Sequence, residues 1–195
     1  MMRGAICEWT CLALALILEG CAGTPAPVPR PPGEAGASPI VRPLQAPREV
    51  RVADSRGGIA WVGDFDAAWR SAAERAEFVV LDVSQLGCSF CTRMEQEVYA
   101  DPEFVEFSRR QVFMRLYRDE NLGKATALWF GVEGFPTILV LTADGREAGR
   151  VVGFRAKSAM IREIQAILDR NTPTVSIELA DEWVARFRSV SGVGR

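Results

Sequence analysis

Two cysteines, Cys88 and Cys91, stand three positions apart in the stretch LGCSFCTR, directly after the apolar run FVVLDVSQ. Two thiols at this spacing can form a redox-active disulfide, a structural disulfide or half of a metal site. The chain has five cysteines among 195 residues, so chance alone would give on the order of 0.1 pairs at this spacing. The spacing would therefore seldom arise by chance, and the surrounding sequence has to decide among these three interpretations.

The apolar run before the pair and the helix expected after it both favour thiol exchange. This reaction needs a thiolate, and a free cysteine with a pKa of about 8.5 is mostly protonated at neutral pH. Cys88 is expected to begin a helix, where unpaired N–H groups and the helix dipole stabilise an anion, so it is the expected nucleophile. Cys91, one turn further along, is spaced to resolve the mixed disulfide. Asp82 lies in the apolar run, where burial raises its proton affinity and suits it to accept the Cys91 proton; a purely structural, hydrogen-bonded Asp82 is the alternative.

Composition removes several classes of function. The chain contains no histidine, which excludes imidazole bases and His-ligated metal sites. The net charge of −2 comes from mixed acidic and basic residues without a basic stripe, so no nucleic acid partner is expected. Zinc prefers four ligands, whereas two thiolates can hold copper(I). A copper(I) chaperone and a redox-inactive binding module therefore remain as alternatives, and a redox enzyme here is expected to need no metal or other cofactor.

Residues 1–21 are predicted to be an export signal. They contain one early positive charge, a short apolar run over 11–18 and small residues near the end. That run is shorter than the roughly 20 residues that span a bilayer. The sequence LEGC resembles a bacterial lipobox, in which Cys21 becomes lipidated, although Glu19 departs from the pattern. Lipid anchoring to a membrane in the periplasm or another extracytoplasmic space is expected, and cleavage after Ala22 to give a soluble secreted protein is the alternative.

Residues 22–55 are predicted to be a Pro-rich linker. Eight of the eleven prolines fall between Pro25 and Pro47, in a segment with few apolar residues. Such a tether extends by about 3.1 Å per residue and would hold a domain several nanometres from a membrane anchor. Residues 56–170 are the predicted globular domain, and residues 171–195 are an extension whose role the sequence does not reveal.

The globular segment alternates strand and helix patterns. The expected strands are 59–62, 78–83, 112–117 and a hairpin over 137–153 with an Asp-Gly turn. Expected helices follow Asp64, begin at the dithiol and break near Ala100, resume at Asp101, cover 121–131, and carry an apolar stripe that ends at Leu168. The first helix would place Ala76 on one face with Phe65 and Trp69. In the tail, an alternating VSIEL precedes Trp183 and Phe187 at helical spacing. This order predicts an α/β fold, a small mixed sheet covered by helices.

The stretch 59–168 resembles a thioredoxin domain, because several separate motifs agree in register. Asp82 stands six residues before Cys88 and matches the buried aspartate of that family. The dithiol matches the family's nucleophilic and resolving cysteines, and GVEGFPT at 131–137 matches its cis-proline loop. Gly153 matches a glycine after the last strand. The segments before and after the dithiol look most like an exported subgroup that includes the C-terminal domain of DsbD.

The resemblance implies a thioredoxin-like fold and a thiol–disulfide oxidoreductase whose redox group is the dithiol itself. It implies a cis bond between Phe135 and Pro136, beside the dithiol, where an extended substrate can pair with backbone groups that continue to Thr137. Arg115 matches a position where thioredoxins often carry lysine, and there it could modulate Asp82. A solvated surface charge is the alternative for this arginine.

The redox direction depends on the residues around the two cysteines. Gly87 stands where many thioredoxins have tryptophan, and the SF dipeptide inside the motif is neither the thioredoxin nor the DsbA dipeptide. No charged residue lies between the cysteines to stabilise the thiolate strongly, and Asp82 favours resolution of the mixed disulfide. A reductase or isomerase is therefore expected, rather than an oxidase. Its expected partners are exported proteins with cysteines and a membrane electron donor.

Overall fold

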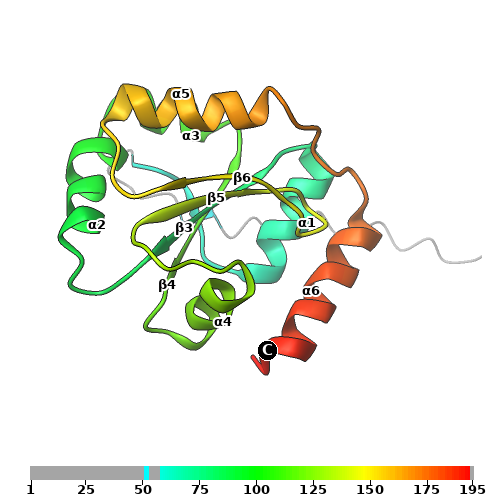
Figure 1. Cartoon of the computed structure of the whole chain (residues 1–195). Coiled ribbons are helices and arrows are strands. Elements are labelled where there is room, and N and C mark those ends of the chain that lie inside the picture. Colours follow the sequence, from blue (N-terminus) through cyan, green and yellow to red (C-terminus); the bar gives the residue numbers. More distant parts are fainter. Residues whose placement is uncertain (1–50, 53–57, 194–195) are drawn as a thin grey trace, which may run out of the picture. The chain divides into compact units, whose positions relative to one another are not determined.

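A mixed β-sheet runs through the residues that the computed structural model describes, 51–52 and 58–193 (Figure 1). Its strands are β1 (Arg51–Val52), β2 (Trp61–Val62), β3 (Val79–Ser84), β4 (Val112–Tyr117), β5 (Thr137–Leu141) and β6 (Glu147–Val152). They are arranged in the order β1-β2-β4-β3-β5-β6. Strand β3 is parallel to β4 and antiparallel to β5. The predicted mixed sheet of the α/β class is confirmed.

The N-terminal predictions lie almost wholly outside the described residues. This applies to the export signal over 1–21, to Cys21 and to nearly all of the linker over 22–55. The exception is β1, two residues near the end of the predicted linker, which pairs antiparallel with β2. The last proline of the predicted linker is Pro47, so both residues of β1 keep the backbone N–H groups that a sheet requires.

Seven helical segments accompany the sheet in the described part of the chain. They are α1 (Phe65–Arg75), α2 (Ser89–Met94), the π-helical η1 (Glu95–Tyr99), α3 (Pro102–Ser108), α4 (Asn121–Trp129), α5 (Lys157–Leu168) and α6 (Ile177–Ser191). Helices α3 and α5 cover one face of the sheet, and α1, α4 and α6 lie toward the other (Figure 1). Each of these helices is too short or too polar to span a bilayer.

Strand β3 is the centre of the sheet, and both of its faces are buried. Val79, Leu81 and Val83 contribute to the core on the side of α1, α4 and α6. Val80 contributes to the core on the side of α3 and α5. Because side chains alternate along a strand, Asp82 lies on the same side as Val80. A continuous apolar run is typical of such a strand, and the prediction for 78–83 is confirmed.

Local capping explains where several helices begin and end. The Asp64 carboxylate accepts the Ala67 N–H at 2.7 Å, and the Asp101 carboxylate accepts the Glu103 N–H at 2.9 Å, as expected at both helix starts. The prediction for Ala76 is wrong. This residue has φ 54° and ends α1 in the left-handed conformation, so it does not share the apolar face of the helix.

Helix α6 belongs to the core, although the sequence did not reveal its role. Phe187 stacks on Phe65 with ring centres 5.1 Å apart, and Trp183 meets Trp69 edge-on at 5.7 Å. VSIEL does not form a strand, because the Ser176 hydroxyl accepts the N–H of a residue three positions later and starts the helix there.

The turn between β5 and β6 shows how closely α6 packs. Gly145 has φ +76°, which favours glycine, and a Cβ added there would collide with the indole of Trp183. The predicted Asp-Gly turn is thus also a packing site for the C-terminal helix.

Candidate active site

Cys88 and Cys91 form a disulfide at the beginning of α2. A short loop after β3 delivers Cys88 to the N-cap position, where its Sγ accepts the Cys91 N–H at 3.1 Å. Cys88 is half-buried, whereas Cys91 is only 6% exposed. The two sulfurs therefore differ in access, and a large partner can reach Cys88 more easily than Cys91.

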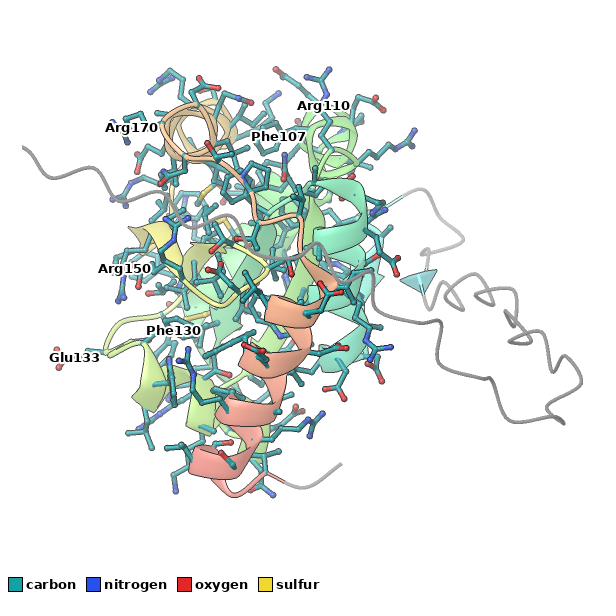
Figure 2. All side chains as sticks on the ribbon, turned by 90° about the vertical axis from the view of Figure 1, so that its right-hand side faces the viewer. Phe107, Arg110, Phe130, Glu133, Arg150 and Arg170 are labelled. Carbon is teal, nitrogen blue, oxygen red and sulfur yellow. A yellow bond between two sulfur atoms is a disulfide. The ribbon has the colours of Figure 1, made fainter. Side chains whose placement is uncertain are left out.

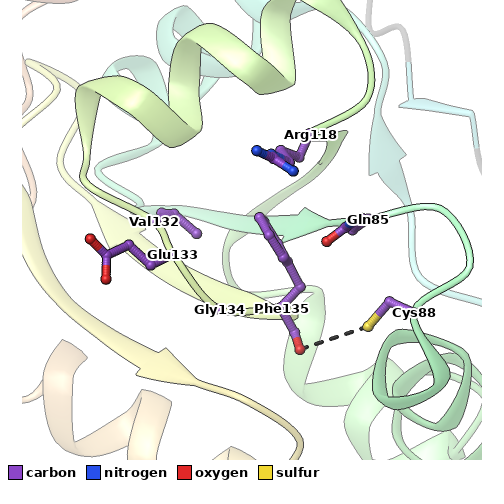
Figure 3. Close-up of a pocket in the computed structure, with 7 residues that line it drawn as sticks. All are labelled: Gln85, Cys88, Arg118, Val132, Glu133, Gly134 and Phe135. Carbon is purple, nitrogen blue, oxygen red and sulfur yellow. Dashed lines mark hydrogen bonds between the residues drawn. The ribbon is translucent and has the colours of Figure 1, made fainter.

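The predicted cis-proline loop lies beside this disulfide. The Phe135–Pro136 bond is cis, and the Phe135 carbonyl oxygen lies 3.7 Å from the Cys88 Sγ (Figure 3). The Gly153 N–H donates to the Pro136 carbonyl at 2.7 Å, so the glycine expected after the last strand holds the loop to the sheet. The Thr137 hydroxyl is buried and donates to the Gly134 carbonyl at 2.7 Å, within the same loop.

Phe135 keeps its backbone groups free for a partner. Among the described residues, its N–H group makes no hydrogen bond, and its carbonyl oxygen meets only the Cys88 Sγ. A sulfur in a disulfide carries no proton, so this contact becomes a hydrogen bond only in the dithiol form. An extended chain that lies along the loop can therefore pair with both groups of Phe135.

Asp82 is buried on the face of the sheet that carries Val80, with 2% of its surface exposed. Its carboxylate accepts hydrogen bonds from the Ser84 hydroxyl at 3.0 Å and from the Arg115 Nε at 2.8 Å. Burial raises the pKa of Asp82 above its ordinary value, and the charge of Arg115 opposes that rise. Among the residues that the structure describes, no hydrogen bond joins Asp82 to either cysteine.

Arg115 links Asp82 to the dithiol helix. It lies opposite Asp82 in the β3–β4 register, and its second guanidinium nitrogen donates to Glu95 at 2.8 Å. Glu95 begins η1, which continues the helix that Cys88 caps. The guanidinium also stacks over the Trp61 ring at 4.3 Å, and only 16% of the side chain is exposed. These surroundings are those of a buried ion-pair network rather than of a solvated charge.

Several residues of the site could not be identified from the sequence. Glu95 and Ser84 complete the network around Asp82, and Tyr99 lies buried beside the same carboxylate. Burial and the negative charge of Asp82 raise the pKa of Tyr99 well above its ordinary value. The sequence gives no sign that these residues converge around Asp82, since Glu95 and Tyr99 lie on η1 and approach β3 only in the folded chain.

A pocket opens beside Cys88. Its volume is about 540 Å³, and it is lined by Gln85, Cys88, Arg118, Val132, Glu133, Gly134 and Phe135 (Figure 3). Cys88, which is half-buried, and Phe135, whose backbone groups are free, thus line the same cavity. In the described part of the chain, cysteine, aspartate and glutamate side chains form no group of three or more that could hold a metal ion.

A thioredoxin-like sheet with a disulfide-bonded C-x-x-C pair supports a thiol–disulfide oxidoreductase. The profile of the thioredoxin-like domain matches residues 65–168, more than half of the chain, so the chain belongs to that family. The predicted resemblance to thioredoxins is confirmed.

Solved structures with TM-scores above 0.5 show the same fold. One is described as DsbH oxidoreductase, with 18% identity and a TM-score of 0.52 over 66% of this chain and 94% of that one. A putative disulphide-isomerase from Bacteroides thetaiotaomicron has 21% identity and a TM-score of 0.53, over 58% and 96%. The C-terminal domain of DsbD from Neisseria meningitidis has 22% identity and a TM-score of 0.46, over 51% and 90%.

Proposed function

We propose that this protein is an extracytoplasmic protein-disulfide reductase or isomerase, with Cys88 as nucleophile and Cys91 as resolving cysteine. The observation that carries the proposal is the asymmetry of the pair. Cys88 is half-buried and faces the 540 Å³ pocket, whereas Cys91 is buried behind it. Attack on a protein substrate requires the accessible sulfur, and internal resolution suits the buried one.

The first step begins with the reduced protein. The Cys88 thiolate attacks one sulfur of a substrate disulfide, a new bond forms between protein and substrate, and the other substrate sulfur leaves as a thiolate. The Cys91 N–H, which points at Cys88 Sγ from 3.1 Å, stabilises the thiolate before attack. A substrate strand that pairs with Phe135 presents its disulfide to the same sulfur.

In the second step, the Cys91 sulfur attacks Cys88 and releases the second substrate sulfur. Two electrons pass to the substrate, which leaves as a dithiol, and the protein is left with its Cys88–Cys91 disulfide. We assign Asp82 as the group that takes the Cys91 proton, through a water or a small movement, because a buried carboxylate with a raised pKa has the required proton affinity. Arg115 moderates this affinity through its ion pair.

We infer the reductase direction from the residues inside the motif. Only Ser89 and Phe90 separate the cysteines, and neither carries a charge that would strongly stabilise a thiolate. A membrane protein that passes electrons to Cys88–Cys91 would then return the protein to its reduced form. Exported proteins with cysteines are the proposed substrates.

The proposed location is supported by the leader and the linker. Residues 1–21 have the composition of an export signal, and disulfide chemistry on protein substrates belongs in an oxidising compartment. Lipid on Cys21 and the Pro-rich 22–55 segment would hold the domain away from a membrane surface.

Trapping of mixed disulfides tests the assignment of the cysteines. Reduced Cys91→Ser protein, incubated with oxidised exported proteins, should accumulate covalent adducts on non-reducing gels, because Cys88 attacks and nothing resolves. Cys88→Ser should give no adducts and no insulin reduction. Adducts on the Cys88 variant alone would reverse the two roles, and tight copper(I) binding without insulin reduction by the unaltered protein would replace the proposal with metal handling.

A further inference from the structure

Arg118 lines the pocket beside Cys88 and has no carboxylate partner among the described residues. Its side chain is exposed, and the guanidinium carbon lies 5.8 Å from the centre of the Phe135 ring (Figure 3). The neighbouring arginines differ, because Arg93 and Arg115 each pair with a carboxylate at 2.9 Å or less. Arg118 therefore keeps its charge and its N–H donors for a ligand of this pocket.

The backbone holds Arg118 in place relative to the dithiol. Its N–H donates to the Ser84 carbonyl at 2.8 Å, which extends the β3–β4 ladder by one bond. The adjacent carboxylate of Asp119 accepts the Leu86 N–H at 2.8 Å and so is committed to the loop before Cys88. These two hydrogen bonds thus connect the segment that carries Arg118 to the loop that leads to Cys88.

Glu133, the other charged residue of the pocket, points away from Cys88 and Phe135 (Figure 3). Glu133 projects outward from its loop (Figure 2), and its carboxylate is directed away from the Phe135 ring (Figure 3). Gln85 adds an uncharged amide on the side of Cys88. The region next to the reacting sulfur is therefore positive, and the negative charge lies at the outer edge.

We propose that Arg118 selects substrates with an acidic side chain next to the reacting cysteine. The inference rests on the proposed function, since the substrate sulfur has to bond to Cys88. A volume of 540 Å³ corresponds to a width of about 8 Å, or about two residues of extended chain. A glutamate or aspartate one or two residues from the substrate cysteine therefore reaches the guanidinium, whose planar fork matches a carboxylate.

Single-turnover exchange with short peptides tests this specificity. Each peptide has one cysteine, joined by a disulfide to 5-thio-2-nitrobenzoate, and carries Glu, Gln or Lys on both sides of that cysteine. Cys88 of the reduced protein attacks the peptide sulfur and expels the coloured thiolate. Cys91 then attacks Cys88 and releases the peptide thiol. Rates with dithiothreitol correct for the intrinsic reactivity of each peptide.

The corrected rate constants should rank Glu above Gln above Lys. An exposed ion pair is worth about 1.5- to 5-fold, so a preference of that size for Glu over Gln is expected, and it should shrink at high salt. Arg118→Gln should remove the ranking, and Arg118→Glu should reverse it. Arg186→Gln is the matched control, because Arg186 is exposed and stacks on Trp183 at the same 5.8 Å but lies on α6.

The outcomes separate the two proposals. Equal corrected rates for the three peptides, or a ranking that survives in Arg118→Gln, would overturn the selection by Arg118 and leave the reductase intact. Exchange no faster than with dithiothreitol for every peptide would instead count against the proposed function itself.

Discussion

At the scale of single residues, the site combines an accessible sulfur, that of Cys88, with a buried carboxylate, that of Asp82. Cys88 lies at a helix start beside an open pocket. Asp82 is buried and accepts hydrogen bonds from Ser84 and Arg115. Burying a charge costs free energy unless it is paired, and Arg115 supplies the pair. Because burial is the largest influence on Asp82, its pKa rises despite that arginine.

Asp82→Asn should therefore stabilise the oxidised protein at neutral pH. Between the ordinary pKa of an aspartate and the raised pKa of Asp82, the folded protein holds a proton that the unfolded chain releases. The stability due to Asp82 thus falls as pH rises through that window. Urea unfolding across a pH series should show the gain in Asp82→Asn greatest above the raised pKa and absent in acid. A less stable variant at neutral pH would mean that the ion pair with Arg115 outweighs burial.

The same substitution separates stability from catalysis. In stopped-flow turnovers, Asp82→Asn should leave the first attack by Cys88 unchanged and slow the release of substrate by Cys91 by about 100-fold, the size of a lost general base. In the unaltered protein, that release should slow as pH falls through the raised pKa of Asp82, because the carboxylate becomes protonated. Slowing of both steps together would argue for a purely structural aspartate.

At the scale of elements, α6 is part of the hydrophobic core and contributes to stability. It lies beyond the 65–168 family match, yet Ala180, Trp183, Val184 and Phe187 are buried in the core with α1. Ion pairs between Arg70 and Asp181 at 2.7 Å and between Arg188 and Asp66 at 2.8 Å flank this contact. The aromatic core, rather than these partly exposed pairs, should carry most of the energy.

Trp183→Ala should lower the free energy of unfolding by about 3–5 kcal/mol, as expected for a buried tryptophan that leaves a cavity. Urea titration measures the loss, and Glu182→Ala at an exposed position of α6 is the control, with a change within about 0.5 kcal/mol. The exchange rate at low temperature should stay unchanged, since α2 and α6 lie at opposite ends of the sheet (Figure 1). A Trp183 variant as stable as the control would show that α6 is an appendage.

The elements that sequence could predict are those with local causes. Asp64 and Asp101 cap their helices, and the run before the dithiol forms a buried strand, because these outcomes depend on neighbours along the chain. The cysteine pair and the proline loop were predicted from local motifs. The Arg115–Glu95 pair joins residues 20 positions apart, and the contacts of α6 with α1 join residues more than 100 apart. Nothing local in the sequence indicates such partners.

At the scale of the whole molecule, the proposed leader and linker would determine where the chemistry takes place. Cys21 should be lipid-modified, and mass spectrometry of a membrane fraction should find the lipid on a mature N-terminal cysteine. Cys21→Ala should release the protein from membranes with its exchange activity intact, because the dithiol domain does not depend on the anchor. A mature chain that begins at Gly23, or an uncleaved leader, would contradict lipidation and favour a soluble secreted form or an unprocessed one.

The reduction potential of the dithiol is also a property of the whole fold, since it reports how much more the folded protein favours the disulfide than the dithiol. Strong oxidants of the DsbA type, at about −120 mV, stabilise their reduced form. Here the Cys88 Sγ has the Cys91 N–H as a donor and no charged residue within the motif, so a value nearer to about −270 mV is expected. The difference between these two potentials corresponds to about 7 kcal/mol, so a measured potential separates the two classes clearly. Equilibration with glutathione measures the potential directly, and a value above about −150 mV, with a reduced form more stable than the oxidised form, would make this protein an oxidase.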